Sequence, residues 1–266
     1  MLRIEPIPCL RDNYAYAIVD EAKAQVAIVD PSELGPIEAY LECRGLELVL
    51  MLATHHHADH VGGAAGLGAR FGLDVVAHTV DAARLRSLGL RTTARADGDR
   101  LACFSAEVEV LHVPGHTLGA ACFVLRESGV LPRLFTGDTL FLGGAGRVFE
   151  GNPAMLRASL ERIAAIAPEA LVYCGHEYTA ANLQFSVRVE PDNTRARDAL
   201  AKARGEATTV PGRLSVERES NPFLRAAGGH RFVVDGVGLG GSADAIFTAL
   251  RAAKDVFKPE ALPAKG

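Results

Sequence analysis

In the segment from Thr54 to His60, four side chains have a spacing that suits metal binding: His55, His57, Asp59 and His60. His55 and His57 lie two residues apart, so in an extended chain their imidazoles point the same way and can bind one ion. Asp59 and His60 follow where the chain is expected to turn, and they can face a neighbouring ion. Imidazole and carboxylate together suit zinc, manganese or iron. The alternatives are a His-rich surface loop and a metal-scavenging tract; because a tract would be repetitive and this cluster is single and spaced, we interpret it as a metal site.

Three further ligand-type residues each follow a β-like apolar stretch. His116 follows residues 108–113, Asp138 follows 131–136, and His176 follows 170–174. A glycine directly precedes each of the three, which fits a sharp exit from a strand. Open α/β sheets place their sites at strand ends, so we expect these residues and the first cluster to converge at one sheet edge.

Seven candidate ligands are too many for one ion, because tetrahedral zinc has four ligands and catalytic zinc keeps one of these positions for water. Divided between two ions, His55, His57 and His116 would bind the first, Asp59, His60 and His176 the second, and Asp138 would bridge them. A water between the ions would have its pKa lowered from ~15.7 to about 7, which makes hydroxide available for attack on a carbonyl or phosphoryl centre. The two carboxylates, Asp138 and Asp59, are the predicted catalytic residues.

These ligands, with Gly-His-Thr at 115–117, Thr-Gly-Asp-Thr at 136–139 and Gly-His-Glu-Tyr at 175–178, resemble the metallo-β-lactamase superfamily. Within it, the chain resembles the glyoxalase II (hydroxyacylglutathione hydrolase) family over nearly its whole length. The motifs behind this closer resemblance are Cys9–Tyr14, Phe135–Phe141, Gly146–Gly151, Val172–Thr179, Val189–Pro191, Asn221–Phe223 and Arg251–Lys258. The resemblance implies an α/β fold: an αββα metallo-β-lactamase-like sandwich in residues 1–175 and a smaller C-terminal α-helical, glutathione-binding domain in residues 176–266.

The resemblance also implies five substrate-binding residues. Arg147, Phe149 and Tyr178 should line the glutathione groove, and Arg251 and Lys254 should reach the carboxylates of the tripeptide. On the alternative interpretation, Arg251 and Lys254 are solvated charges on a terminal helix. If they bind substrate carboxylates far from the scissile bond, their loss should raise KM and leave kcat nearly unchanged. Phe149 stands where the family often has Tyr, so one hydroxyl contact is absent.

The activity implied by the resemblance is hydrolysis of S-D-lactoylglutathione and other 2-hydroxyacylglutathiones, the second step of methylglyoxal detoxification. The implied cofactor is two divalent ions, zinc in first place and iron or manganese as alternatives. A thiol of pKa ~8.5 leaves readily, so no dedicated general acid is required. An alternative is a mononuclear iron persulfide dioxygenase of the same superfamily, which normally lacks a long helical region like residues 177–258. Further alternatives are a diiron oxygen-reducing oxidoreductase, which carries Glu where this chain has His57, a non-catalytic metal-binding relative, and a Cys174–His176 nucleophile.

Composition excludes several classes of protein. The chain has 266 residues, 48% of them hydrophobic, enough for one large or two unequal domains. A formal net charge of −4 gives no indication of binding to nucleic acid or to anionic membranes. No run approaches the ~18 apolar residues of a membrane span. Five cysteines without a close pair fit a reducing compartment. We therefore expect a cytoplasmic monomer whose partner is a small-molecule glutathione thioester.

Alternating strands and helices are predicted up to about residue 175, as layered α/β architecture requires. The predicted strands are 16–20, 25–30, 46–53, 74–77 and three between 100 and 126; the predicted helices are 37–44, 64–71, 80–88, 154–166, 180–189, 194–207 and 243–258. Residues 208–222 are predicted to be loop, and the Gly-rich segment 225–242 receives no assignment. His56 should hydrogen-bond within its own loop, and His78, His112 and His230 should not bind metal.

Overall fold

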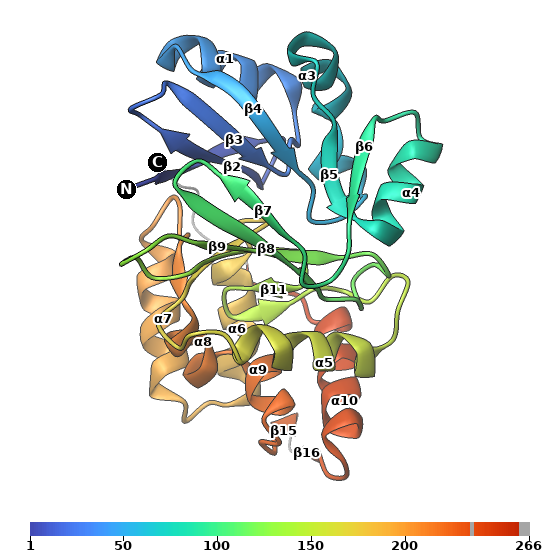
Figure 1. Cartoon of the computed structure of the whole chain (residues 1–266). Helices are drawn as coiled ribbons and strands as arrows, with labels where there is room; N and C mark the ends of the chain where they lie inside the picture. Colours follow the sequence, from blue (N-terminus) through green and yellow to red (C-terminus); the bar gives the residue numbers. More distant parts are fainter. Residues whose placement is uncertain (235–236, 261–266) are drawn as a thin grey trace.

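Two six-stranded sheets pack face to face, with helices on both outer faces (Figure 1). The structure, a computed structural model, describes residues 1–234 and 237–260. Within these ranges no helix combines the length and apolar character that a membrane crossing needs. The predicted αββα sandwich with a helical C-terminal region is confirmed.

The first sheet is built by the N-terminal part of the chain and has the order β1-β2-β3-β4-β5-β6. Its strands are β1 (Arg3–Cys9), β2 (Asn13–Asp20), β3 (Gln25–Val29), β4 (Glu47–Leu52), β5 (Val75–His78) and β6 (Thr92–Arg95). The helices α1 (Leu34–Arg44), α3 (Ala64–Phe71) and α4 (Thr79–Ser87) cover its outer face (Figure 1). The pattern did not predict β1, whose Pro6 and Pro8 are tolerated because it is an edge strand.

Alternation along β2 shows why this sheet has two buried faces. Tyr14, Tyr16 and Ile18 pack between the sheets, whereas the intervening small residues Ala15 and Ala17 pack under the outer helices. Successive side chains of a strand point to opposite faces, so one apolar run serves both layers. A strand covered on both sides is apolar nearly throughout, as β2 is.

The second sheet has the order β14-β13-β10-β9-β8-β7. Its strands are β7 (Arg100–Cys103), β8 (Ala106–His112), β9 (Ala121–Arg126), β10 (Arg133–Gly137), β13 (Leu171–Cys174) and β14 (Gly212–Arg213). Strand β9 is antiparallel to both β8 and β10, and β10 is parallel to β13. The carboxyl ends of β8, β10 and β13 therefore lie at the same edge. The small β11 (Leu140–Phe141) and β12 (Gly144–Ala145) hairpin follows β10, and α5 (Pro153–Ala164) packs outside the sheet.

The C-terminal region gathers on the outer side of the second sheet (Figure 1). Its helices are α6 (Thr179–Val189), α7 (Thr194–Arg204), α8 (Leu214–Ser220), α9 (Pro222–Ala227) and α10 (Ala243–Val256). The predicted loop at 208–222 is wrong, because β14 pairs with β13 and α8 follows at once. The unassigned segment 225–242 contains the end of α9 and the short pair β15 (Val233–Val234) and β16 (Val237–Gly238), between which residues 235–236 lie outside the described part. Strand β14 follows residue 176 in the chain but belongs to the second sheet. The domain boundary at residue 176 therefore stays a prediction.

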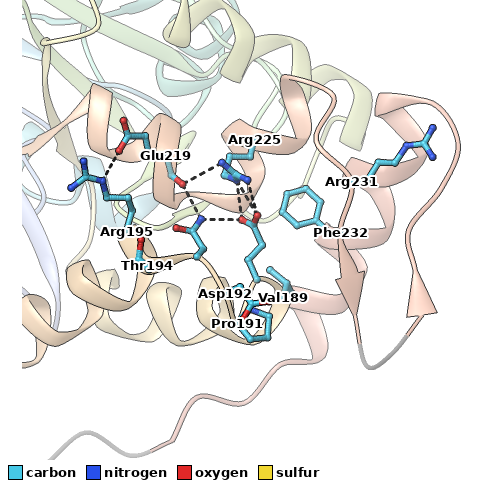
Figure 2. Close-up of a pocket in the computed structure, with 11 residues that line it drawn as sticks. Val189, Pro191, Asp192, Thr194, Arg195, Glu219, Arg225, Arg231 and Phe232 are labelled. Atoms are coloured by element: carbon cyan, nitrogen blue, oxygen red, sulfur yellow. Dashed lines mark hydrogen bonds and ion pairs between the residues drawn. The ribbon is translucent and has the colours of Figure 1, made fainter.

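An open groove of about 630 Å³ lies between α6, α7 and α9 (Figure 2). Its arginines are largely paired within the groove: Arg225 binds Glu190 at 2.8 Å, and Arg195 binds Glu219 at 2.9 Å. The first ion pair joins α9 to the C-terminal end of α6, and the second joins α7 to α8. We assign the groove no ligand.

A buried carboxylate joins α8 to the β11–β12 hairpin. Glu217 accepts hydrogen bonds from Gly143 N at 2.7 Å and from Asn221 Nδ2 at 3.1 Å. Asn221 Nδ2 lies also within 3.1 Å of Phe141 O and 2.9 Å of Gly144 O. Burial raises the pKa of Glu217 to about 7.

Glu217→Gln is expected to stabilise the protein at pH 8 more than at pH 5. The folded pKa is raised above its usual value of 4.5, so the contribution of Glu217 to stability is full below about pH 4.5 and is lost as the pH rises through about 7. A shift of this size corresponds to at most roughly 3 kcal/mol in the free energy of unfolding. Urea denaturation of both proteins at the two pH values measures it. A stability difference that does not change with pH would contradict the prediction.

Candidate metal centre

The seven predicted ligands converge where the two sheets adjoin. Strand β4 of the first sheet leads into residues 55–60, whereas β8, β10 and β13 of the second sheet lead to the other three. The expectation of a single sheet edge is therefore wrong, because the sandwich brings two edges together. Backbone bonds join them: Ala121 N donates to Thr54 O at 2.8 Å, and Tyr14 N donates to Gly175 O at 2.9 Å.

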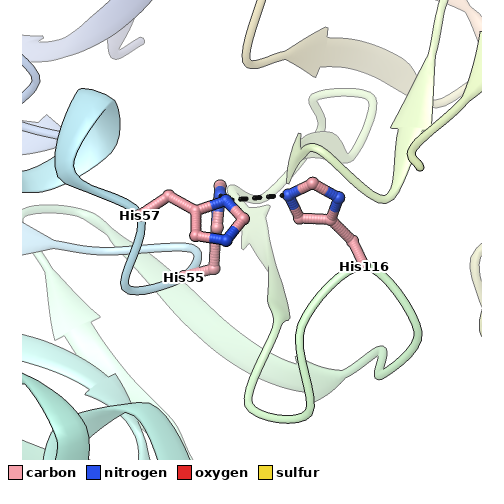
Figure 3. Close-up of side chains that lie close together, drawn as sticks. All are labelled: His55, His57 and His116. Atoms are coloured by element: carbon pink, nitrogen blue, oxygen red, sulfur yellow. Dashed lines mark hydrogen bonds between the residues drawn. The ribbon is translucent and has the colours of Figure 1, made fainter. Parts of the chain in front are cut away.

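The ligand atoms form two groups with one carboxylate between them. In the first, His57 Nδ1 lies 3.1 Å from both His55 Nε2 and His116 Nε2 (Figure 3). In the second, His176 Nε2 lies 3.3 Å from His60 Nε2 and 3.4 Å from Asp59 Oδ2. The carboxylate is Asp138, whose Oδ1 lies 3.3 Å from His60 Nε2 and whose Oδ2 lies 3.6 Å from His116 Nε2. Among the described residues, the groups able to hold a metal ion all belong to this cluster.

Hydrogen bonds behind the ligands determine which ring nitrogens face inward. The Nδ1 atom of His116 lies 2.8 Å from Arg147 O, that of His60 2.9 Å from Asp30 Oδ2, and that of His176 2.9 Å from Asp12 Oδ1. Carbonyl and carboxylate oxygens only accept, so each Nδ1 carries a proton and each Nε2 can present a lone pair. The Nε2 atoms of His60 and His176 lie 3.3 Å apart, and two lone pairs cannot form a hydrogen bond with each other, but both can bind the same cation.

A buried oxygen atom without a hydrogen bond also indicates a metal site. Asp138 Oδ1 is shielded from solvent and has no hydrogen-bond partner in the described structure. Buried acceptors left unpaired are costly, which a metal ion beside this oxygen would relieve. The ligand set therefore fits divalent ions.

Neighbouring charged side chains shift the pKa values of the candidate ligands strongly. Burial by itself lowers the pKa of His60, but the carboxylates of Asp138 and Asp30 outweigh it and raise that pKa well above the ordinary value. Burial likewise opposes ionisation of Asp138, yet His60 and His176 hold the pKa of its carboxyl well below the usual range. Metal ions and protons thus compete for the same atoms, and metal affinity should fall in acid.

Two glycines next to ligands are required by space or backbone conformation. Gly137, which precedes Asp138, has φ +48°, and a Cβ there would lie 2.3 Å from Thr54 Oγ1. Gly175, which precedes His176, has no positive φ, but its Cβ would lie 2.4 Å from Asp138 Oδ1 and 2.6 Å from His60 Cε1. At Gly175 the reason is the neighbouring ligands themselves, not the sharp exit from a strand expected from the sequence.

Three residues that support the ligands were missed from the sequence. Asp12 and Asp30 accept from His176 and His60, and Asn13 Nδ2 donates to Asp59 Oδ2 at 3.1 Å. Asp30 ends the apolar run of β3, so it repeats the pattern of a strand followed by a ligand-type residue. Asp12 and Asn13 lie inside the Cys9–Tyr14 motif that carries the family resemblance, but the resemblance did not predict a role for either residue.

The remaining histidines bind other protein groups. His56 Nδ1 lies 3.1 Å from Asp81 Oδ1 of α4, so the expectation of a bond within its own loop is wrong. His78 and His112 stack with ring centroids 3.9 Å apart. Cys174 is fully buried, and burial raises the pKa of its thiol to about 12, which disfavours it as a nucleophile.

A cavity of about 620 Å³ opens over the metal ligands. Arg147, Phe149 and Tyr178, three of the predicted substrate-binding residues, line it together with Phe141. The ring of Tyr178 stacks on His176 at 4.7 Å, and the exposed Phe149 meets the rings of His57 and His116 edge-on. The cavity wall is therefore aromatic, with a single guanidinium group.

The other two predicted substrate contacts do not line this cavity. Arg251 is only 6% exposed and donates to Ala145 O, Gly146 O and Asp255 Oδ1. Lys254 is half-buried, with Nζ 5.5 Å from the Phe185 ring and 5.3 Å from the Phe257 ring. Burial lowers the pKa of Lys254 to about 8. Neither side chain is a solvated surface charge.

The fold and the paired ligand groups define a metal-dependent enzyme of the metallo-β-lactamase superfamily, whose family model matches residues 11–176. A model of the hydroxyacylglutathione hydrolase C-terminus matches residues 177–257. A hydroxyacylglutathione hydrolase of Cereibacter sphaeroides is 41% identical over 96% of this chain and 99% of the relative, and one of Ruegeria pomeroyi is 43% identical over the same shares. The chain belongs to the hydroxyacylglutathione hydrolase family.

Solved structures share the fold at lower identity. ETHE1 from Myxococcus xanthus is 24% identical and superposes with a TM-score of 0.67, over 99% of this chain and 95% of that one. TTHA1623 in a di-iron-bound form is 27% identical with a TM-score of 0.58, over 83% of this chain and all of that one. The first likeness concerns the fold alone.

Proposed function

We propose that this protein hydrolyses S-D-lactoylglutathione and other 2-hydroxyacylglutathiones, releasing glutathione and, from the former, D-lactate, as the second step of methylglyoxal detoxification. The observation that carries the proposal is a seven-ligand centre beneath an open cavity, in a chain about 40% identical to hydroxyacylglutathione hydrolases over nearly its whole length. A C-terminal region of the matching family packs beside that cavity.

The proposed cofactor is two divalent ions, zinc in first place and iron or manganese as alternatives. Two ligand groups around Asp138 support two ions, as does the likeness to a protein with a di-iron form. When bound, the ions would supply the Lewis acidity that activates a water and polarises the thioester carbonyl. Asp138, between the groups, and Asp59, on the cavity wall, are the proposed catalytic carboxylates.

The cavity side chains would hold the thioester over this centre. Arg147 can pair with a substrate carboxylate, and the exposed faces of Phe149 and Tyr178 can cover its apolar parts. Burial and the nearby Asp12 raise the pKa of Tyr178, so its phenol stays neutral and can donate a hydrogen bond. The thiolate of glutathione is a good leaving group, so no further acid is needed.

The purified protein is expected to contain two metal ions per chain and to hydrolyse S-D-lactoylglutathione. Prolonged chelation should abolish activity, and zinc, manganese or iron should restore it, because the ligands remain after the ions are removed. Elemental analysis and an assay of thiol release measure both. Full activity with one ion would refute the two-ion centre. Oxygen consumption with glutathione persulfide, without thioester hydrolysis, would establish the dioxygenase alternative instead.

A cytoplasmic location, a monomeric state and the assignment of residues 176–266 as the glutathione-binding domain stay predictions. The described cysteines are all free, which agrees with the reducing compartment inferred from composition.

A further inference from the structure

One acidic residue of helix α4, Asp81, contacts both loops that carry the first group of metal ligands. Its side chain is buried, with 1% of the residue exposed. Asp81 Oδ1 lies 3.1 Å from His56 Nδ1, and Asp81 Oδ2 lies 3.5 Å from Thr117 Oγ1. His56 stands between two ligands in the 55–57 loop, and Thr117 directly follows a third in the 116–119 loop. A single carboxylate therefore links the two loops.

In the 55–57 loop, the middle histidine lies on the side of the chain opposite to its neighbours. The backbone is extended at His57, with φ −61° and ψ 142°. Successive side chains of an extended segment point to opposite sides. His56 accordingly contacts Asp81, whereas His55 Nε2 and His57 Nδ1 lie 3.1 Å apart at the metal centre. A hydrogen bond that fixes His56 therefore also fixes the backbone from which both ligands project.

In the 116–119 loop, Asp81 packs against the backbone as well as the Thr117 hydroxyl. A Cβ on Gly119 would lie 2.1 Å from Asp81 Oδ1 and 2.6 Å from Asp81 N. The start of α4 therefore approaches the loop too closely for any side chain at this position. Both contacts lie within three residues of His116, so they limit where the backbone of that ligand can move.

Burial of the Asp81 carboxylate makes these contacts necessary. A buried carboxylate is costly unless it is paired and hydrogen-bonded. Within the part of the chain that the structure describes, Asp81 pairs with His56 and with no lysine or arginine. The carboxylate is therefore held at the position where its contacts with His56 and Thr117 are both made.

A second chain of contacts joins α4 to the same two loops nearer the surface. Arg84 Nη1 binds Glu150 Oε1, and Glu150 Oε2 accepts from Leu118 N at 2.9 Å. The same Oε1 lies 3.5 Å from His56 Nε2. Arg84 is exposed, and exposed ion pairs contribute little. The buried contacts of Asp81 are therefore the ones to test.

We propose that Asp81 is a positioning residue for the first metal group, which consists of His55, His57 and His116. It fixes one loop relative to the other, so that the three imidazoles converge on the same ion (Figure 3). The proposal rests on the proposed metal-dependent function. It adds to that function a residue outside both the ligand set and the lining of the cavity.

The test compares Asp81→Ala with the wild type in metal affinity and in kinetics. Competition with a chromophoric chelator for zinc is expected to show about tenfold weaker binding of one ion, the lower end for loss of a group that supports ligands. The other ion should bind normally, because Asp12, Asp30 and Asn13 support the second group. Hydrolysis of S-D-lactoylglutathione should show a reduced kcat at limiting zinc, which recovers at excess zinc, with KM unchanged.

Two further variants test the contacts of Asp81 themselves. Asp81→Asn keeps an oxygen that accepts from His56 and gains an amide that can donate to Thr117 Oγ1, so zinc affinity should stay near that of the wild type. His56→Phe keeps a ring but cannot donate, so it should weaken the binding of one ion as Asp81→Ala does. It replaces the alanine variant if that one does not fold.

Leu85→Ala is the matched control, because Leu85 is fully buried on the same helix. It should lower stability without weakening zinc binding. Normal zinc affinity in Asp81→Ala or in His56→Phe would overturn the proposal. Equal loss of zinc in Leu85→Ala or in Asp81→Asn would also overturn it. Because zinc affinity is measured without substrate, absence of thioester hydrolysis in the wild type would refute the proposed function alone.

Discussion

Asp138→Ala is expected to lower kcat/KM for thioester hydrolysis by ~10³-fold or more. Both ligand groups lose the carboxylate between them, and the reaction loses the several kcal/mol by which bound ions would stabilise the transition state. The fold should persist. Asp138 Oδ1 makes no hydrogen bond, and His60 keeps its contact with Asp30 at 2.9 Å. Steady-state kinetics, metal content and a urea unfolding curve of the variant measure the three effects.

Asp12→Asn is the matched control for this substitution. The new amide oxygen can still accept from His176 Nδ1, so the ring keeps its orientation and loses only a charged partner. A loss of roughly tenfold is expected, as for other residues that support metal ligands. Equal losses in the two variants, or a fully active Asp138→Ala protein, would show that Asp138 does not lie between two ions.

Gly175→Ala is expected to reduce activity on the order of 100-fold, the effect of displacing a reacting group by about an ångström. The added Cβ would lie 2.4 Å from Asp138 Oδ1, so either the carboxylate or strand β13 must move. Metal content should fall with activity, because the collision involves a ligand atom. Elemental analysis beside kinetics tests this link.

Gly35→Ala is the control for a glycine replaced without a collision. Gly35 lies in helix α1 with no atom within 4 Å of its ideal Cβ, so the change should be neutral or stabilise by up to ~1 kcal/mol. A Gly175→Ala protein with normal metal content and activity would mean that the close packing behind the ligands is not needed.

The candidate metal ligands could be picked out from the sequence because they are short-range signals: one polar cluster follows the apolar run before Thr54, and His116, Asp138 and His176 each follow a further apolar run. The same signal occurs at Asp30 and was overlooked, since the hairpin containing it was interpreted only as structure. Asn13 could not be placed, because it reaches Asp59 over a separation of 46 residues in the chain, and Asp12 could not be placed, because its contact with His176 crosses between the sheets. Such a contact depends on how two layers pack, which no local pattern encodes.

The C-terminal region shows where sequence patterns are too short. Helices α8 and α9 span seven and six residues, so neither repeats an apolar position often enough to show a helical period. Arg251 illustrates a second limit. A charged residue on an amphipathic helix is normally solvated, and only the tertiary structure shows that its partners are carbonyls of residues 145 and 146.

The location of the metal centre between two sheets has a consequence for the stability of the chain. Ligands from residue 55 to residue 176 come together only when both layers are assembled, so ions bind the native state and have little affinity for the unfolded chain. Metal at a hundred times its dissociation constant then adds about 2.7 kcal/mol to the free energy of unfolding for each independent site. Bound ions would thus link the two sheets of the sandwich. A shortage of metal would therefore lower the free energy of unfolding of the protein as well as its activity.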